Sequence, residues 1–267
     1  MSSPLSQIGH RLTWAPDLFQ VLVLNRLSPA RRHGAIIASS FCRTVRVHSR
    51  SKIPELGWAA LLQELGLSGN APVMLPGPLT ATENVGDANY YFALGALVRA
   101  LQPRRVLEIG TYLGVGTCSI AMNAGPNCRI FTVDLPDGAS ATEAHALNSV
   151  DRDHVKRSRG RVGEAFLGSP YEAQIAQLRA DSLSFRAEDH VSDVDLTFID
   201  GGHSLPCITK DTENAIRVTA PDGLILWDDY FHLYPEVVAF LDKLHGNLQL
   251  CRIAGTNLVL HSRRWTQ

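Results

Sequence analysis

Hydrophobic and polar positions along this chain switch between a helical spacing and short apolar runs. Tyr91, Leu94, Leu97, Val98 and Leu101 recur three or four positions apart, which predicts a helix over residues 90–101. Further helices are predicted at 118–124, near 141–150, at 208–218 and at 235–244. Compact apolar runs predict strands at 106–109, 129–134, 175–180, 194–199, 224–227, 248–253 and 258–261.

The predicted strands and helices follow one another in turn over most of the chain after residue 84. Because parallel strands need a crossover connection, usually a helix, this order predicts an α/β fold with a doubly wound, Rossmann-like parallel sheet. The turn Pro221-Asp222-Gly223 is expected to lead into the strand at 224–227. The last two strands have no helix between them and are expected to form an antiparallel edge.

The first 80 residues follow a different pattern and are expected to form an N-terminal, mainly helical extension. An apolar patch from Leu18 to Leu24 precedes a basic stretch from Arg31 to Lys52. Pro72, Pro76 and Pro78 indicate a loop, so the chain is divided into residues 1–80 and 81–267. The extension is interpreted as a solvated helical face or, alternatively, as a lid, a substrate contact or a dimer contact.

Composition narrows the class of protein. The 267 residues are 45% hydrophobic and 19% charged, which is typical of a folded globular protein. A net charge of −1 gives no overall attraction to nucleic acid or to an anionic membrane. The five cysteines are scattered without a CxxC pair, and no apolar run is long enough to cross a bilayer. A cytoplasmic protein without nucleic-acid or membrane partners is therefore expected.

Three glycines stand between the strand at 106–109 and the helix that follows it. Gly110, Gly114 and Gly116 come directly after the apolar run that contains Glu108. Glycines allow the backbone to approach a ligand closely, and free N–H groups lie at the start of the helix. A strand, a glycine turn and a helix in this order predict a cradle for a nucleotide-like ligand.

Acidic residues end the next strands of the predicted sheet. Ligands of such sheets bind outside the carboxyl ends of the strands. Asp134 ends the second strand, where a carboxylate can accept hydrogen bonds from a ribose diol. Asp181 and Ser182 follow the third strand, where a carboxylate can meet an adenine amino group. The remaining acids are Asp200 after the fourth strand and Asp228 and Asp229 after the fifth.

These last three acids predict a metal site. Neighbouring strands lie about 4.8 Å apart, so Asp200, Asp228 and Asp229 converge if the fourth and fifth strands are adjacent. Ionised carboxylates at that range repel one another unless a cation lies among them, and oxygen ligands suit Mg²⁺. His203 follows Asp200 by three residues and is predicted to act as the general base.

A short-chain dehydrogenase would also account for the glycine spacing. Such an enzyme needs a catalytic Tyr with a Lys four residues later. The positions four residues after the six tyrosines hold Leu94, Gly95, Gly116, Ile175, Tyr234 and Val238. None of these residues is a lysine, which argues against the dehydrogenase.

The motifs together resemble those of the class I S-adenosylmethionine-dependent methyltransferases. The stretch Val-Leu-Glu-Ile-Gly-Thr-Tyr-Leu-Gly-Val-Gly-Thr resembles their first motif, Phe-Thr-Val-Asp their second and Arg-Ala-Asp-Ser their third. The fourth and fifth motifs are similar to Val-Asp-Leu-Thr-Phe-Ile-Asp-Gly-Gly-His and Pro-Asp-Gly-Leu-Ile-Leu-Trp-Asp-Asp-Tyr. The resemblance covers residues 84–262 and implies a seven-stranded sheet in the order 3-2-1-4-5-7-6 with the last strand antiparallel.

The resemblance also implies a cofactor and a set of site residues. S-adenosylmethionine would be held by Glu108, Gly110, Thr111, Gly114, Gly116, Asp134, Asp181 and Ser182. Asp200, Asp228 and Asp229 match the metal positions of Mg²⁺-dependent O-methyltransferases, with Asp200 and His203 as catalytic residues. A His at position 203 resembles the sugar O-methyltransferases of macrolide biosynthesis, whereas catechol-type members have a Lys there.

The resemblance leaves the acceptor open. Residues 135–174 are longer than a minimal connection, and residues 1–80 match no substrate-recognition segment. The expected function is methyl transfer to a hydroxyl of a small molecule (a sugar, diol or phenol). The alternatives are an S-adenosylmethionine-binding protein without transfer activity and a metal-assisted hydrolase or hydroxylase on the same scaffold. A homo-oligomer is a further expectation, because apolar and basic extensions often pair subunits.

Overall fold

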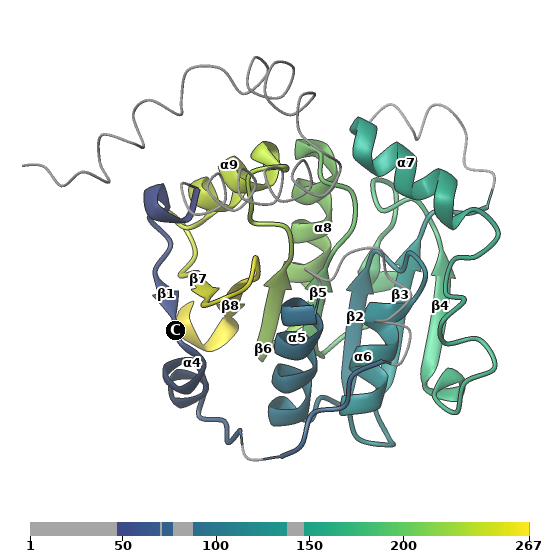
Figure 1. The fold of residues 1–267 in the computed structure, drawn as a ribbon, viewed down its shortest axis with the longest axis horizontal. Coiled ribbons are helices and arrows are strands. Elements are labelled where there is room, and N and C mark those ends of the chain that lie inside the picture. The colour runs from purple at the N-terminus through teal and green to yellow at the C-terminus, as the bar shows by residue number, and fades with distance from the viewer. Residues whose placement is uncertain (1–46, 70, 77–87, 138–146, 267) are drawn as a thin grey trace, which may run out of the picture. The chain divides into compact units, whose positions relative to one another are not determined.

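The computed structural model describes residues 47–69, 71–76, 88–137 and 147–266 (Figure 1). The chain divides into two compact units, Met1–Arg50 and Ser51–Gln267, and the elements below belong to the second unit. The apolar patch Leu18–Leu24, the basic positions from Arg31 to Arg46 and most of the helix expected near 141–150 lie outside the described residues. The division near residue 80 and the roles expected of residues 1–80 stay predictions.

A mixed β-sheet forms the centre of this unit (Figure 1). Its strands run in the spatial order β1-β7-β8-β6-β5-β2-β3-β4. β8 is antiparallel to both of its neighbours, and the other paired strands are parallel. The strands are β1 (Glu55–Leu56), β2 (Arg105–Ile109), β3 (Arg129–Asp134), β4 (Ile175–Arg179), β5 (Val194–Ile199), β6 (Thr219–Trp227), β7 (Cys251–Ile253) and β8 (Val259–Ser262).

Strands β2 to β8 confirm the predicted α/β fold and the predicted order, but the predicted count of seven is wrong. The described sheet has eight strands, because β1 adds itself to β7 at the edge. Arg252 donates its backbone N–H to the carbonyl of Pro54, and its guanidinium pairs with Glu55 at 2.8 Å. A strand of two residues is too short to produce a hydrophobic pattern, so β1 could not be predicted from periodicity.

Helices cover both faces of the sheet. Neighbouring residues of β2 point to opposite faces: Val106 packs with Leu97 of one helical layer, and Leu107 packs with Val218 of the other. The α-helices are α4 (Trp58–Leu65), α5 (Ala88–Leu101), α6 (Val115–Asn123), α7 (Ser149–Ser158), α8 (Leu205–Val218) and α9 (Pro235–Leu244). Short 3-10 helices are η5 (Glu172–Gln174), η6 (Ala187–Asp189) and η7 (Arg263–Thr266).

Two local predictions were wrong. Pro221-Asp222-Gly223 forms no separate turn, because β6 runs through it as a bulge. Val194 pairs with Thr219 and Leu196 with Leu224, so a longer stretch of β6 faces a shorter stretch of β5. The helix expected near 141–150 does not include residue 148. Asn148 instead caps α7, its side chain accepting from the backbone N–H groups of Val150 and Asp151.

No helix among the described residues is both long and apolar enough to cross a membrane.

Candidate active site

The glycine turn after β2 has the close backbone packing expected of a ligand cradle. Gly110 has a φ of +104°, and a Cβ at this position would lie 1.9 Å from the carbonyl oxygen of Asp200. Gly114 has a φ of +83° and is the N-cap of α6. A side chain at Gly116 would meet Glu108 Oε1 at 2.9 Å. Gly110 therefore requires glycine for steric reasons, the positive φ of Gly114 favours glycine, and a side chain at Gly116 would displace the Glu108 carboxylate.

Asp134 holds the glycine turn from the end of β3. Its Oδ2 accepts from the backbone N–H groups of Thr111 at 3.0 Å and Tyr112 at 2.6 Å, and its Oδ1 accepts from Leu135 at 2.7 Å. Burial raises the pKa of Asp134, and these three hydrogen bonds oppose that shift. Thr111 is buried and shares a 2.7 Å hydrogen bond with the hydroxyl of Thr132. In this structure Asp134 therefore stabilises the glycine turn by hydrogen bonds.

Glu108 faces the inside of the same turn. Its Oε2 accepts from the hydroxyls of Thr117 at 2.5 Å and Thr132 at 2.6 Å. The residue is 1% exposed, and burial raises its pKa to about 7 despite these hydrogen bonds. Glu108 thereby links β2 to the first turn of α6 and to β3.

Asp181 and Ser182 follow β4 at the same edge of the sheet. Asp181 Oδ1 accepts from the backbone N–H of Leu183 at 3.0 Å. Ser182 lies near Asp211 of α8, whose two carboxylate oxygens are buried without a hydrogen-bond partner among the described residues. Burial raises the pKa of Asp211 to about 7, and the nearby Ser182 hydroxyl opposes that shift.

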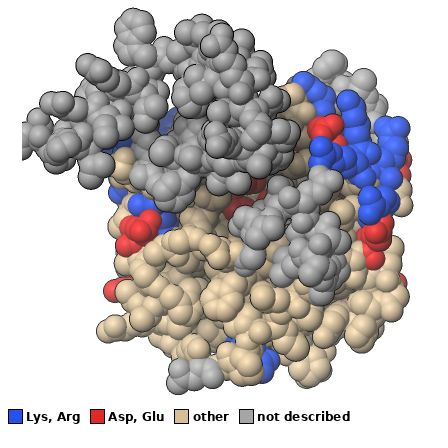
Figure 2. All heavy atoms as spheres, in the orientation of Figure 1, with Lys and Arg blue, Asp and Glu red and all other residues tan. Residues whose placement is uncertain are grey.

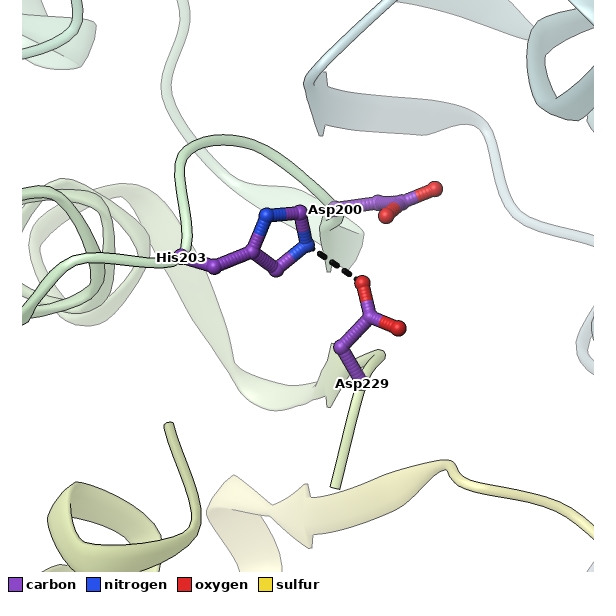
Figure 3. A group of neighbouring side chains, drawn as sticks. All are labelled: Asp200, His203 and Asp229. Atoms are coloured by element: carbon purple, nitrogen blue, oxygen red, sulfur yellow. Dashed lines mark hydrogen bonds and ion pairs between the residues drawn. The ribbon is translucent and has the colours of Figure 1, made fainter. Parts of the chain in front are cut away.

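Asp200, His203 and Asp229 gather at the carboxyl ends of β5 and β6 (Figure 3). One ligand atom of each residue lies within 4.8 Å of the other two, which is close enough to share a metal ion. In Figure 3 the imidazole of His203 points to Asp229, and its Nε2 contacts Asp229 Oδ2. Adjacent strands β5 and β6 bring the two carboxylates together, as the sequence predicted.

Asp228, the third predicted metal ligand, is turned toward its own backbone. Its Oδ1 accepts from the backbone N–H of Asp229 at 2.7 Å. Asp229 has a φ of +65°, a left-handed conformation that Asp tolerates better than most residues. The group of possible metal ligands is therefore Asp200, His203 and Asp229. Asp228 still lies close enough to raise the pKa of Asp200.

The charges in this cluster perturb one another strongly. Burial and the carboxylates of Asp228 and Asp229 raise the pKa of Asp200 well above its ordinary value. Burial disfavours the charged imidazole of His203, but Asp229 and Asp151 outweigh that effect and raise its pKa well above the ordinary value. The two carboxylates beside the imidazole thus favour its protonated form, whose positive charge would offset part of the carboxylate repulsion.

Three residues of the site were missed by the reasoning from sequence. Asp151 of α7 binds His203 through both the ring and the backbone. Tyr234 stacks on the His203 ring with centroids 3.8 Å apart. Tyr90 of α5 donates its hydroxyl to Asp200 Oδ2 at 3.3 Å. Asp151 belongs to none of the motifs described above. Tyr90 and Tyr234 lack the lysine of a dehydrogenase pattern, and no other motif singles them out.

The solvent face of α7 is basic. Figure 2 shows Lys and Arg side chains gathered where Figure 1 places this helix. The exposed basic residues are Arg152, Lys156, Arg157 and Arg159, with Asp153 pairing to Arg157 at 3.0 Å. The helix that contacts His203 on one side therefore carries positive charge on the other.

Comparison with known proteins identifies the domain. Residues 107–230 match the family Methyltransf_24, described as a methyltransferase domain. A probable O-methyltransferase of Mycobacterium tuberculosis is 39% identical over 83 residues, which are 30% of this chain and 34% of that protein. The chain therefore aligns with about a third of the length of this curated relative.

Solved structures share the fold at low sequence identity. The S-adenosylhomocysteine-bound methyltransferase PaMTH1 of Podospora anserina is 16% identical, with a TM-score of 0.50 over 90% of this chain and 99% of its own. The O-methyltransferase TomG of Streptomyces achromogenes, solved with S-adenosylmethionine, is 18% identical, with a TM-score of 0.45 over 66% of this chain and 80% of its own. Residues 107–230 of this chain thus match a methyltransferase domain, and the strand order agrees with the one expected for a class I methyltransferase.

Proposed function

We propose that this protein transfers the methyl group of S-adenosylmethionine to a hydroxyl oxygen of a small molecule, with the help of Mg²⁺. One observation carries the proposal: the glycine turn and the acid cluster are in direct backbone contact. Asp200 donates its backbone N–H to the carbonyl of Ile109 at 2.8 Å, and Gly110 packs against the Asp200 carbonyl. A cofactor in the turn and an acceptor at the cluster would therefore be neighbours, as in-line transfer requires.

The cofactor would lie along the carboxyl edge of β2, β3 and β4. Gly110, Thr111, Gly114 and Gly116 would line it, because glycines let a cofactor approach the backbone closely, and Glu108 would fix the turn. Asp134 would bind the ribose, since a carboxylate has about four acceptor positions and three are engaged by backbone N–H groups. Asp181 and Ser182 would contact the adenine.

The donor set fits a hard divalent cation. Asp200 and Asp229 supply carboxylate oxygens, Asp228 lies beside them, and burial together with their like charges raises the pKa of Asp200. Mg²⁺ bound by these three residues would lower the pKa of an acceptor hydroxyl and orient it toward the methyl group. If His203 is instead a ligand, the nitrogen donor favours a transition metal such as Zn²⁺.

His203 would accept the proton of the acceptor hydroxyl through Nε2. This nitrogen faces the cluster, whereas Nδ1 is engaged by Asp151. A base must be neutral to act, and pairing with Asp229 raises the pKa of the imidazole, which favours the protonated form. His203 could therefore accept a proton only when Asp229 binds the cation instead of the imidazole. The activity of the base would then depend on cation binding.

The acceptor is proposed only as a class, a small molecule with a hydroxyl group. The curated relative is described as a probable O-methyltransferase, and TomG is described as an O-methyltransferase involved in tomaymycin synthesis. Acceptor specificity would depend on residues 1–80 and 135–174, because these segments lie outside the shared motifs.

Calorimetric titration with S-adenosylmethionine, with and without Mg²⁺, tests the cofactor first. Micromolar binding of S-adenosylmethionine and no binding of NAD⁺ are expected. A panel of sugars, diols and phenols then tests transfer, with S-adenosylhomocysteine as the measured product. Binding without product from any acceptor would favour a non-catalytic binding protein, and absence of binding would overturn the proposal.

A further inference from the structure

A carboxylate from a distant segment holds the ring of His203 in place. Asp151 Oδ1 lies 2.5 Å from His203 Nδ1, and Asp151 Oδ2 accepts from the His203 backbone N–H at 2.9 Å. Both residues are buried, at 4% and 9% exposure. One carboxylate thus fixes both the ring and the main chain of the loop that carries His203.

The carboxylate is itself fixed by local structure. Asp151 lies in the first turn of α7, and the Asn148 side chain accepts from its backbone N–H at 2.9 Å. Tyr234 stacks on the imidazole with an interplanar angle of 15°. The ring is therefore held at its edge by Asp151 and across its face by Tyr234.

We propose that Asp151 is a positioning residue, which keeps the proton of the neutral His203 ring on Nδ1 so that Nε2 is free to accept a proton from the acceptor. The inference rests on the proposed function, in which His203 is the base. Asp151 acts through His203 and is distinct from the carboxylates assigned to the cation.

A carboxylate is needed at position 151 because it binds both the backbone N–H and the Nδ1 of His203. An ionised carboxylate only accepts, so both the His203 backbone N–H and Nδ1–H can donate to it. An Asn at position 151 has one acceptor oxygen and one donor amide. Its oxygen would take the backbone N–H, which leaves the amide facing Nδ1. The neutral ring would then carry its proton on Nε2 and could not act as a base.

The first test compares Asp151→Asn with Asp153→Asn. Asp153 lies on the same helix, is half exposed and pairs with Arg157, so its variant controls for changes to the helix. With Mg²⁺ and an accepted substrate, Asp151→Asn should lower kcat about 10²- to 10⁴-fold, with KM and the Kd for S-adenosylmethionine unchanged. Wild-type kcat in Asp151→Asn, or an equal loss in Asp153→Asn, would overturn the inference.

The second test needs no activity and no folded variant at position 151. Nitrogen-15 spectra of histidine-labelled wild-type protein, recorded with Mg²⁺, report which ring nitrogen carries the proton. His203→Gln identifies the signals by their loss. At alkaline pH the neutral His203 ring should be protonated on Nδ1. Protonation on Nε2 would overturn the inference, whereas failure of every acceptor in the panel would overturn the proposed function alone.

Discussion

The glycine turn and the acid cluster touch each other, yet they are built in different ways. The turn is nearly continuous in sequence, since Glu108 to Thr117 supply its glycines and the hydroxyl that binds Glu108. The cluster draws on α5, α7, the loop after β5, the residue pair after β6 and the start of α9. Its most distant members, Tyr90 and Tyr234, are more than a hundred residues apart in the sequence.

This difference has a physical consequence. A turn specified by local sterics keeps its shape as long as the glycines remain. A cluster assembled from distant elements depends on the balance of buried charges, because Asp229 shifts the pKa of both Asp200 and His203. We expect substitutions in the turn to act on folding and cofactor affinity, and substitutions in the cluster to act on turnover.

The largest effect is expected from Asp200→Asn. Loss of this carboxylate removes a cation ligand, which should lower turnover about 10³-fold and abolish stimulation by Mg²⁺, since a bound metal contributes several kcal/mol to the reaction. Initial rates across a Mg²⁺ series measure both effects. Asp228→Asn should behave alike, and Asp222→Asn, an exposed acid of β6 paired with Arg264, serves as the control. Retained Mg²⁺ dependence in Asp228→Asn would remove Asp228 from the ligand set.

The next effect is expected from His203→Gln. Removal of the base should lower kcat about 10²- to 10⁴-fold and leave the Kd for S-adenosylmethionine unchanged. Single-turnover kinetics with calorimetric titration of the cofactor separate the two quantities. His190→Gln is a suitable control, because this exposed histidine stacks on Phe185 away from the cluster. Unchanged kcat in His203→Gln would show that another group takes the proton.

Gly110→Ala tests whether the two regions are mechanically joined. The new Cβ would collide with the Asp200 backbone and would also hold a positive φ, so we expect a loss of about 3–5 kcal/mol in the free energy of unfolding. Gly160→Ala has a similar φ of +71° with no atom within 4 Å, and should lose only about 1–2 kcal/mol. Urea denaturation compares them. Equal losses would mean that the contact with Asp200 contributes little.

The smallest effect is expected from Glu108→Gln and depends on pH. The folded protein binds the Glu108 proton more tightly than the unfolded chain, because burial raises the pKa from 4.5 to about 7. Stability is therefore lost as pH rises through this window, by up to about 3 kcal/mol above pH 7. Glu108→Gln cannot ionise, so its stability relative to wild type should increase between pH 4.5 and pH 8.

Denaturation at both ends of that pH range measures the change for Glu108→Gln. Glu164→Gln is the control of opposite sign, because hydrogen bonding to Arg161 lowers the pKa of this exposed carboxyl. A Glu108→Gln variant whose relative stability does not change with pH would show that Glu108 is ionised in the folded protein across the whole range.

The fold and the residues at the carboxyl edge of the sheet could be predicted from local patterns in the sequence. Apolar runs located β3 and β5 to the residue, and the strand order followed from the resemblance carried by the motifs. Strands of buried parallel sheets are continuous and apolar, so their pattern is local and strong. The glycines after β2 and the acids after β5 and β6 belong to the same local signal, which is why they were found.

The arrangement of the acid cluster, in contrast, depends on contacts between segments that are distant in the sequence. Asp151 lies on a helix that was expected earlier in the chain, and no spacing relates it to His203, fifty-two residues away. The left-handed backbone at Asp229 turns its carboxylate to the imidazole while Asp228 faces the backbone. Contacts between distant segments depend on how helices pack on the sheet, and periodicity along one chain carries no record of that packing.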